Sequence, residues 1–178
     1  MTLTLEEVGR AIGETRMVRP GRLAPHPKFG ICLDLGCGSG PKRPAPGFSA
    51  YADVIRPGPG IILPQPYFCT PMEDLSCFED KTFDWVRSHH SAEHCLDPDK
   101  ACSEMVRVGK AGIISFPPMH ACLLFGRKDH VWLMVVDHGR LMFIRKRHPS
   151  YGVPRSVCGA ELNREFRWEG SFRWIVVA

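Results

Sequence analysis

The stretch ICLDLGCGSGPKRPAPGFSAYADVI, residues 31–55, decides the fold. A short apolar run leads into glycines at alternate positions, Gly36, Gly38 and Gly40, and a second apolar run then carries a single acid, Asp53. Apolar runs of this kind are typical of parallel strands that are covered on both faces. A glycine loop at a strand exit lets the backbone approach a ligand, and an acid after the next strand can accept hydrogen bonds from a ribose diol. The stretch therefore predicts an open α/β sheet with a nucleoside-containing cofactor at the carboxyl ends of its strands.

The composition of the chain is that of an ordinary globular protein. Of its 178 residues, 44% are hydrophobic and 24% are charged, which predicts one domain over residues 1–178. The formal net charge of +4 permits an anionic ligand and does not indicate nucleic acid. The eight cysteines form no CxxC pair, and the first residues contain neither a secretory leader nor an apolar run long enough to span a membrane. We expect reduced thiols, no metal site and a cytoplasmic location.

Four short apolar runs are predicted to be strands, and one later segment is predicted to be a helix. The strands are expected at 29–35, 49–54, 83–88 and 112–116. Asp97 can cap the helix, Pro98 suits its first turn and Gly109 suits its end. Three prolines within residues 41–46 leave no room for a regular helix between the first two strands, so the first crossover helix is expected to be reduced.

The last third of the chain changes character. Two β-rich runs flank residues 137–139, which is a strong hairpin signal, and residues 169–170 mark a second hairpin candidate. Near the N-terminus, Thr4 and Glu7 can form a capping box, which predicts a short helix. Parallel strands followed by antiparallel ones predict an α/β fold with a doubly wound, mixed sheet.

The spacing of the glycine loop argues against one class of cofactor. The GxGxxG fingerprint of dinucleotide-binding proteins needs its third glycine three residues after the second, and here that position is Pro41. The sequence has the spacing GxGxG instead, led by the acid Asp34. A nicotinamide oxidoreductase is therefore disfavoured.

In these details the sequence resembles the class I S-adenosylmethionine-dependent methyltransferases, in particular the broad methyltransferase type 11 group. LDLGCGSG, residues 33–40, is similar to the first motif of that family. The block at residues 72–117 is similar to the segment that runs through its fourth and fifth strands. The resemblance implies a Rossmann-like methyltransferase fold with S-adenosylmethionine as cofactor, a cofactor-binding core at about 30–118 and a hairpin-rich acceptor or cap region at 119–178.

The resemblance also implies roles for residues around the cofactor. The methionine end would be surrounded by Asp34, Gly36, Cys37, Gly38 and Gly40. Asp53 would bind the ribose hydroxyls and Val54 would lie beside the adenine. Met72 and Glu73 would lie along the adenine edge.

A histidine-rich segment, SHHSAEHC, stands at the carboxyl end of a predicted strand, where such folds place their chemistry. By resemblance, Ser88 and His89 would lie near the sulfonium. Methyl transfer is an in-line displacement, and an acceptor hydroxyl can also need a base. His90 and His94 are the candidates, because histidine titrates near neutral pH; the alternative is that both pack under the cofactor or cap the helix. A zinc site that uses His90, His94 and Cys95 is a weaker interpretation, since no CxxC or HExxH spacing is present.

The residues after the last parallel strand are expected to select the acceptor. Residues 117–118, two prolines, would end the strand and place His120 over the pocket. His130 and Trp132 would add a polar and a flat surface for the acceptor. The alternative is that Trp132 is a core residue and His130 a turn residue.

Two functions fit the sequence. The first is methyl transfer to the O or N of a small molecule. The second is binding of S-adenosylmethionine without transfer, in the service of a partner or a biosynthetic complex. Nucleic acid is disfavoured as the substrate, because the Pro-Pro-aromatic motif of base-amine methyltransferases and the Pro-Cys nucleophile of cytosine-C5 enzymes are both missing from the expected places. The oligomeric state is not indicated.

Overall fold

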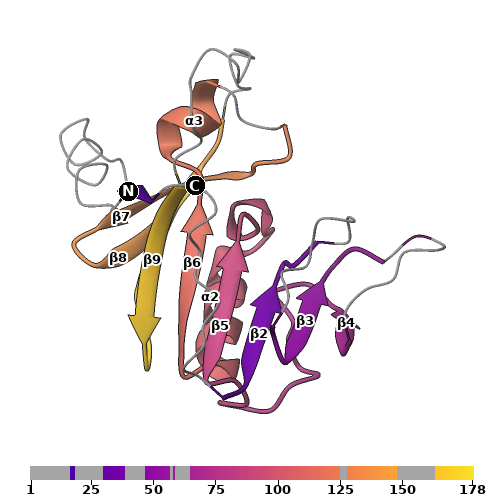
Figure 1. Cartoon of the computed structure of the whole chain (residues 1–178). Coiled ribbons are helices and arrows are strands. Elements are labelled where there is room, and N and C mark those ends of the chain that lie inside the picture. The colour runs from indigo at the N-terminus through magenta and orange to yellow at the C-terminus, as the bar shows by residue number, and fades with distance from the viewer. Residues whose placement is uncertain are drawn as a thin grey trace.

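The mixed sheet expected from the apolar runs is present in the computed structural model (Figure 1). The structure describes residues 17–18, 30–38, 47–56, 58, 65–124, 128–147 and 163–178. The helix predicted near the N-terminus, Gly40 and the proline-rich segment 41–46 lie outside these residues.

The main sheet has the strand order β1-β9-β6-β5-β2-β3-β4. In chain order its strands are β1 (Met17–Val18), β2 (Cys32–Leu35), β3 (Ala50–Asp53), β4 (Tyr67–Cys69), β5 (Trp85–His89), β6 (Ala111–Phe116) and β9 (Asn163–Glu169). The strands from β6 to β4 are parallel, whereas β9 is antiparallel to β6 and β1 is antiparallel to β9. The chain proceeds from β2 towards one edge and then returns to β5 on the other side, so the topological switch point lies between β2 and β5. The predicted α/β fold with a mixed sheet is confirmed.

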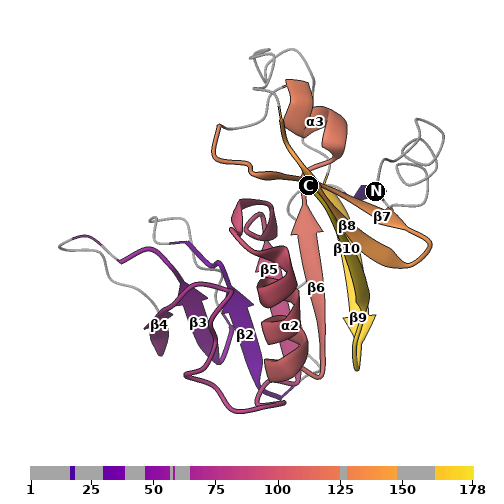
Figure 2. The ribbon, with the colours of Figure 1, turned by 180° about the vertical axis from the view of Figure 1, so that it is seen from behind.

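Helix α2 (Pro98–Val108) lies against one face of this sheet and has the predicted ends (Figure 2). The side chain of Asp97 accepts the N–H of Lys100 at 3.1 Å, Pro98 begins the helix and Gly109 follows it. The residues that the helix buries are Pro98, Ala101, Cys102, Met105 and Val108. Two shorter helical segments flank the carboxyl edge of the sheet, η1 (Ala92–His94) after β5 and α3 (Met119–Leu124) after β6.

A second sheet has three strands in the order β10-β8-β7, with the bounds β7 (Trp132–Asp137), β8 (Arg140–Arg145) and β10 (Arg173–Val177). β7 and β8 form the hairpin predicted around residues 137–139. Its two loop residues, His138 and Gly139, have φ values of +46° and +69°, the combination found in a type I′ turn.

The second predicted hairpin, around residues 169–170, is wrong. β9 joins the main sheet, whereas β10 joins the small sheet and runs parallel to β8. The ring of Phe172, between them, packs against Trp168 of β9 and Trp174 of β10. The Nε1–H of Trp174 also donates to Asp99 at the start of α2 at 2.7 Å. The pairing of β9 with β6 and of β10 with β8, together with these aromatic contacts, therefore outweighs the local pairing that the turn residues favour.

Candidate functional site

The glycine loop leaves β2 at the carboxyl edge of the sheet. Gly36 and Gly38 have φ values of +71° and +77°, which glycine adopts without strain. The N–H of Gly36 donates to the carbonyl of Ala52 on β3 at 2.7 Å, so the loop turns over the neighbouring strand. A Cβ at Gly36 would collide with the side chain of Ser91, whose hydroxyl donates to the carbonyl of Leu35 at 3.2 Å. Gly36 is thus required by packing against the segment after β5.

Asp53 ends β3 beside this loop and is 7% exposed. Its Oδ2 accepts the N–H of Gly38 at 2.7 Å, and its Oδ1 accepts the N–H of Ile55 at 2.9 Å. Each oxygen keeps room for a further donor, since an ionised carboxylate has about four acceptor positions. Val54 and Ile55 are 67% and 50% exposed, so an apolar surface lies directly beside this carboxylate.

Asp34 is engaged in a buried ion pair. It is 1% exposed, and its two oxygens accept Nε–H and Nη2–H of Arg87 on β5, both at 2.9 Å. Asp34 and Arg87 are register partners on adjacent strands, and the guanidinium lies over the ring of Phe48 at 4.6 Å from its centroid. The pair gives Asp34 a structural role that the resemblance did not imply.

Cys37, within the loop, and Ser88, on β5, are both buried. Burial raises the pKa of the Cys37 thiol to about 12, and the nearby carboxylates of Asp34 and Asp53 contribute to this rise, so the thiol is protonated at neutral pH. Ser88 is 0% exposed, and its Oγ lies 2.9 Å from the Oγ of Ser91. Both residues therefore support the loop through packing and internal hydrogen bonds.

Met72 and Glu73, predicted at the adenine edge, make their contacts with the core and with α2. Met72 is 8% exposed and belongs to the main hydrophobic core. The Oε1 of Glu73 accepts the N–H of Leu96 at 2.6 Å and that of Asp97 at 3.4 Å. Glu73 thereby fixes the turn that leads into α2.

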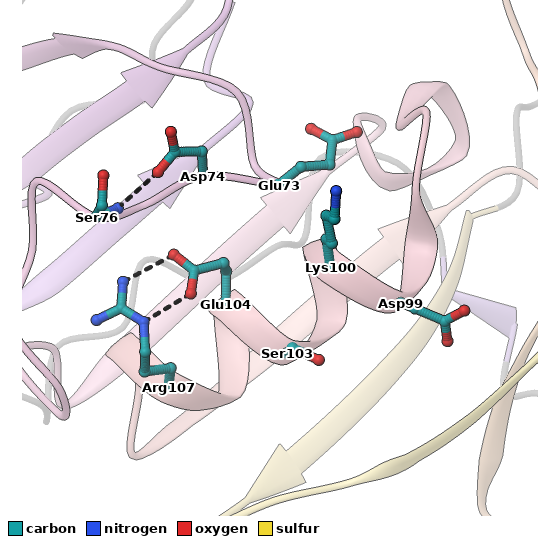
Figure 3. A pocket seen from close by; sticks show the side chains of 8 residues that line it. All are labelled: Glu73, Asp74, Ser76, Asp99, Lys100, Ser103, Glu104 and Arg107. Atoms are coloured by element: carbon teal, nitrogen blue, oxygen red, sulfur yellow. Dashed lines mark hydrogen bonds and ion pairs between the residues drawn. The ribbon is translucent and has the colours of Figure 1, made fainter.

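A groove of about 560 Å³ runs between α2 and the loop after β4 (Figure 3). The side chains that line it are Glu73, Asp74, Ser76, Asp99, Lys100, Ser103, Glu104 and Arg107. Two bonds join Arg107 to Glu104, Nε to Oε1 at 2.6 Å and Nη2 to Oε2 at 2.7 Å, and the N–H of Leu75 donates to the same Oε2 at 2.7 Å. These bonds hold the loop onto the helix. We therefore interpret the groove as structural and take the carboxyl edge of the sheet as the candidate site.

Glu104 is expected to make the stability of the fold sensitive to acid. The hydrogen bond from Arg107 holds the pKa of Glu104 below its ordinary value. The pair therefore stabilises the folded state above about pH 4.3, the unfolded pKa, and this stabilisation is lost as the pH falls through the lower folded pKa. In urea unfolding at a series of pH values, Glu104→Gln should lose less stability than the unsubstituted protein between about pH 5 and pH 3. The exposed Glu79→Gln is the control, and equal acid dependence in all three proteins would contradict the expectation.

The histidine-rich segment follows β5, and its residue His90 has an uncommon backbone conformation. His90 has a φ of +52°, a left-handed conformation that few residues with a side chain adopt. Its Nε2 lies 2.8 Å from the Oδ1 of Asn163 on β9, and its Nδ1 lies 3.3 Å from the Oε1 of Glu93. The ring of His89 packs edge-on against it, with the centroids 4.6 Å apart. His90 keeps 22% of its side chain exposed at the carboxyl edge.

The residues predicted to contact the acceptor are not gathered on one surface. His120 is exposed on α3. Trp132 is 4% exposed and its Nε1–H donates to the carbonyl of Cys95 at 2.7 Å, so of the two positions that the sequence left open it occupies the core. His130 is 7% exposed and its ring packs against that of His94, with the centroids 4.8 Å apart. The structure thus brings together two histidines that the sequence placed in different roles.

Sequence reasoning gave no role to Arg87, Ser91 or Asn163. An arginine inside a buried strand signals a buried anionic partner, so the pairing of Arg87 with Asp34 was open to prediction. The contacts of Ser91 with Gly36 and of Asn163 with the histidine-rich segment join distant parts of the chain and leave no local pattern.

Residues 48–116 match the family described as "Methyltransferase domain", of the type 11 group. The match begins after the glycine loop and includes Asp53 and the histidine-rich segment. The PH0226 protein from Pyrococcus horikoshii OT3 is similar in structure, with a TM-score of 0.45 and 18% identity over 78% of this chain and 82% of that chain. The YcgJ protein from Bacillus subtilis is similar with a TM-score of 0.37 and 17% identity over 64% of this chain and 51% of that chain. No curated protein matches the sequence significantly.

Among the helices of the described residues, none has the length and apolar character needed to cross a membrane.

Proposed function

We propose that this chain, whose residues 48–116 carry a type 11 methyltransferase domain, transfers a methyl group from S-adenosylmethionine to the O or N of a small molecule. The observation that carries the proposal is the arrangement around Asp53. Its buried carboxylate is joined to Gly38 of the glycine loop, and it is flanked by the exposed side chains of Val54 and Ile55. A carboxylate with spare acceptor positions beside an apolar surface suits a ribose diol attached to an adenine ring.

In this proposal the cofactor would be held by three features of the carboxyl edge. Asp53 would accept hydrogen bonds from the ribose hydroxyls, and Val54 with Ile55 would contact the adenine. The backbone at Gly38 would face the methionine end. The bound cofactor supplies an electrophilic methyl group, so the main task of the protein is to position the acceptor in line with it.

His90 is the proposed proton acceptor. It stands at the end of β5 with 22% of its side chain exposed, and its Nδ1 lies 3.3 Å from the Oε1 of Glu93. The Nδ1 of His94 instead lies 2.9 Å from the carbonyl of Asp129, and its ring packs against His130, which makes it the weaker candidate. His120, exposed on α3, remains the proposed contact with the acceptor.

Asp53→Asn is expected to weaken S-adenosylmethionine binding by about 1.5–3 kcal/mol, roughly 10- to 150-fold, because it removes charge-assisted hydrogen bonds and keeps the shape. Isothermal titration calorimetry with S-adenosylmethionine and with its demethylated product measures the effect. NAD serves as the ligand control, and Asp80→Asn, whose side chain is 76% exposed on another loop, serves as the matched variant. Equal affinity in Asp53→Asn and the unsubstituted protein would remove Asp53 from the site.

The same titration decides between the two functions. Micromolar binding together with methyl transfer to a member of a panel of alcohols, phenols, carboxylic acids and amines supports the proposal. Binding without transfer on the whole panel supports a cofactor-binding protein that serves a partner. If neither S-adenosylmethionine nor its product binds, the proposal is refuted.

A further inference from the structure

Glu93 is a wholly buried acid in the 3-10 segment η1. It is 0% exposed, and neither of its carboxylate oxygens accepts a hydrogen bond from the described residues. The Nδ1 of His90 is close to Oε1, at 3.3 Å, but this contact is not a hydrogen bond. An ionised carboxylate without donors is costly in a protein interior, and a cation bound beside it would offset this cost.

Two imidazoles lie beside this carboxylate. Glu93, His94 and His130 each offer one ligand atom, and the three atoms lie within 4.8 Å of one another. The cluster joins η1 to the residues just before β7, and the N–H of Val131 donates to the carbonyl of Glu93 at 2.9 Å. A backbone hydrogen bond therefore fixes the two segments that bring the three side chains together.

The hydrogen bonding of His94 is that of a metal ligand. Its Nδ1 lies 2.9 Å from the carbonyl oxygen of Asp129, and the Oδ2 of the same residue is 3.7 Å away. Because a carbonyl only accepts, Nδ1 must carry a proton, and in the neutral ring the lone pair that can bind a metal is then on Nε2. Histidines that bind a metal commonly donate their other N–H to a carbonyl or a carboxylate in this way.

His130 and Cys122 supply two further donor atoms to this cluster. His130 is 7% exposed, and its ring packs against that of His94, with the centroids 4.8 Å apart. The Sγ of Cys122, on α3, lies 3.3 Å from the Nδ1 of His130 and is 1% exposed. Two imidazoles, a carboxylate and a thiol are the donor types that zinc prefers.

We propose that Glu93, His94 and His130 bind one zinc ion, with Cys122 as the fourth ligand. The ligand atoms of Glu93, His94 and His130 lie within 4.8 Å of one another, and zinc bonds of about 2.0–2.3 Å would draw these side chains and Cys122 closer together. The Cys122 thiol releases its proton to solvent when the sulfur binds the ion. The ion compensates the charge of Glu93 and joins η1, α3 and the start of β7. This proposal does not depend on the identity of the cofactor or of the acceptor, and it replaces the expectation from the sequence that the chain has no metal site.

Glu93→Gln gives the sharpest test, because it should raise the stability of the metal-free protein and lower its affinity for zinc. The substitution removes an uncompensated buried charge and keeps the shape, so the metal-free variant should unfold at a higher temperature than the metal-free parent. Its zinc affinity should nevertheless fall by about 100-fold or more, since a direct ligand matters more than an outer-shell partner, whose loss costs about 10- to 100-fold. Protein stripped with a chelator and freed of any tag is titrated with zinc, and one equivalent should bind per chain.

Matched variants separate this site from adventitious binding. His94→Ala should weaken zinc binding as Glu93→Gln does, whereas His138→Asn, on the exposed β7–β8 turn, should bind like the parent. With cobalt in place of zinc, a thiolate charge-transfer band should appear in Cys77→Ser and be missing in Cys122→Ser. Zinc that does not bind, or that binds equally to the parent, Glu93→Gln and His94→Ala, overturns the proposal. Cobalt bound without a thiolate band in the parent overturns the role of Cys122 and supports a three-residue site.

Discussion

Asp34→Ala is expected to lower the free energy of unfolding by about 3–5 kcal/mol, the usual cost of removing one partner of a buried ion pair. Asp34 is 1% exposed and the side chain of Arg87 is 12% exposed, so the substitution leaves a guanidinium unpaired between two central strands. Urea denaturation of the parent and the variant at neutral pH measures the loss.

A double substitution separates the charge from the packing at this position. Asp34→Leu together with Arg87→Met replaces the pair by apolar side chains and should recover most of the stability lost in Asp34→Ala. Calorimetric titration of the same proteins with S-adenosylmethionine then tests the role that the resemblance implied for Asp34. A variant with unchanged stability and greatly weakened cofactor binding would show that Asp34 serves the cofactor and not the sheet.

Gly36→Ala is expected to lower the free energy of unfolding by about 3 kcal/mol, from two sources of similar size. A residue with a Cβ costs about 1–2 kcal/mol in the left-handed conformation, and φ at Gly36 is +71°. Overpacking costs about 1–3 kcal/mol, and a Cβ here would collide with the side chain of Ser91. Urea denaturation again gives the total.

Two further variants divide the effect of Gly36→Ala. Gly47 has a φ of +93°, and a Cβ added there would meet no described atom within 4 Å, so Gly47→Ala should show only the backbone cost. In the Gly36→Ala background, Ser91→Gly removes the atoms that collide with the new Cβ. The double variant should therefore be about 1–3 kcal/mol more stable than the sum of the two single effects predicts. If the changes in unfolding free energy caused by the two single substitutions simply add in the double variant, a Cβ at position 36 does not collide with Ser91.

The elements that the sequence predicted correctly are those whose cause is local. Asp97, Pro98 and Gly109 delimit α2 because capping depends on neighbouring backbone groups. The two-residue turn at His138 and Gly139 forms its hairpin because the turn geometry matches the twist of the strands.

The errors fall where contacts between distant segments decide the structure. β9 and β10 belong to separate sheets because β9 pairs with β6 and β10 pairs with β8, two strands far from them in the sequence. For Trp132 the sequence left a ligand-facing and a core position open, and the structure has the core position, with the indole bonded to the carbonyl of Cys95. A single sequence shows the type of such a side chain and not what lies opposite it.

The residues of the candidate site also differ in whether local sequence or contacts between distant segments reveal them. The acid Asp53 and the loop glycines were recognisable because they follow strands, and the carboxyl ends of parallel strands meet at one edge. The cluster of Glu93, His94 and His130 was not predicted, since His130 reaches it from a segment far along the chain.

The positions of β9 and β10 have a consequence for the kinetics of folding. Ile114 of β6 pairs with Phe166 of β9, and Leu141 of β8 pairs with Trp174 of β10, so both sheets depend on contacts between residues far apart in the chain. Topologies dominated by such contacts have a high contact order and fold slowly. Until β9 and β10 dock, β6 and β8 each present an open edge to other chains, which favours aggregation. The yield of refolded protein should therefore fall steeply as the protein concentration rises.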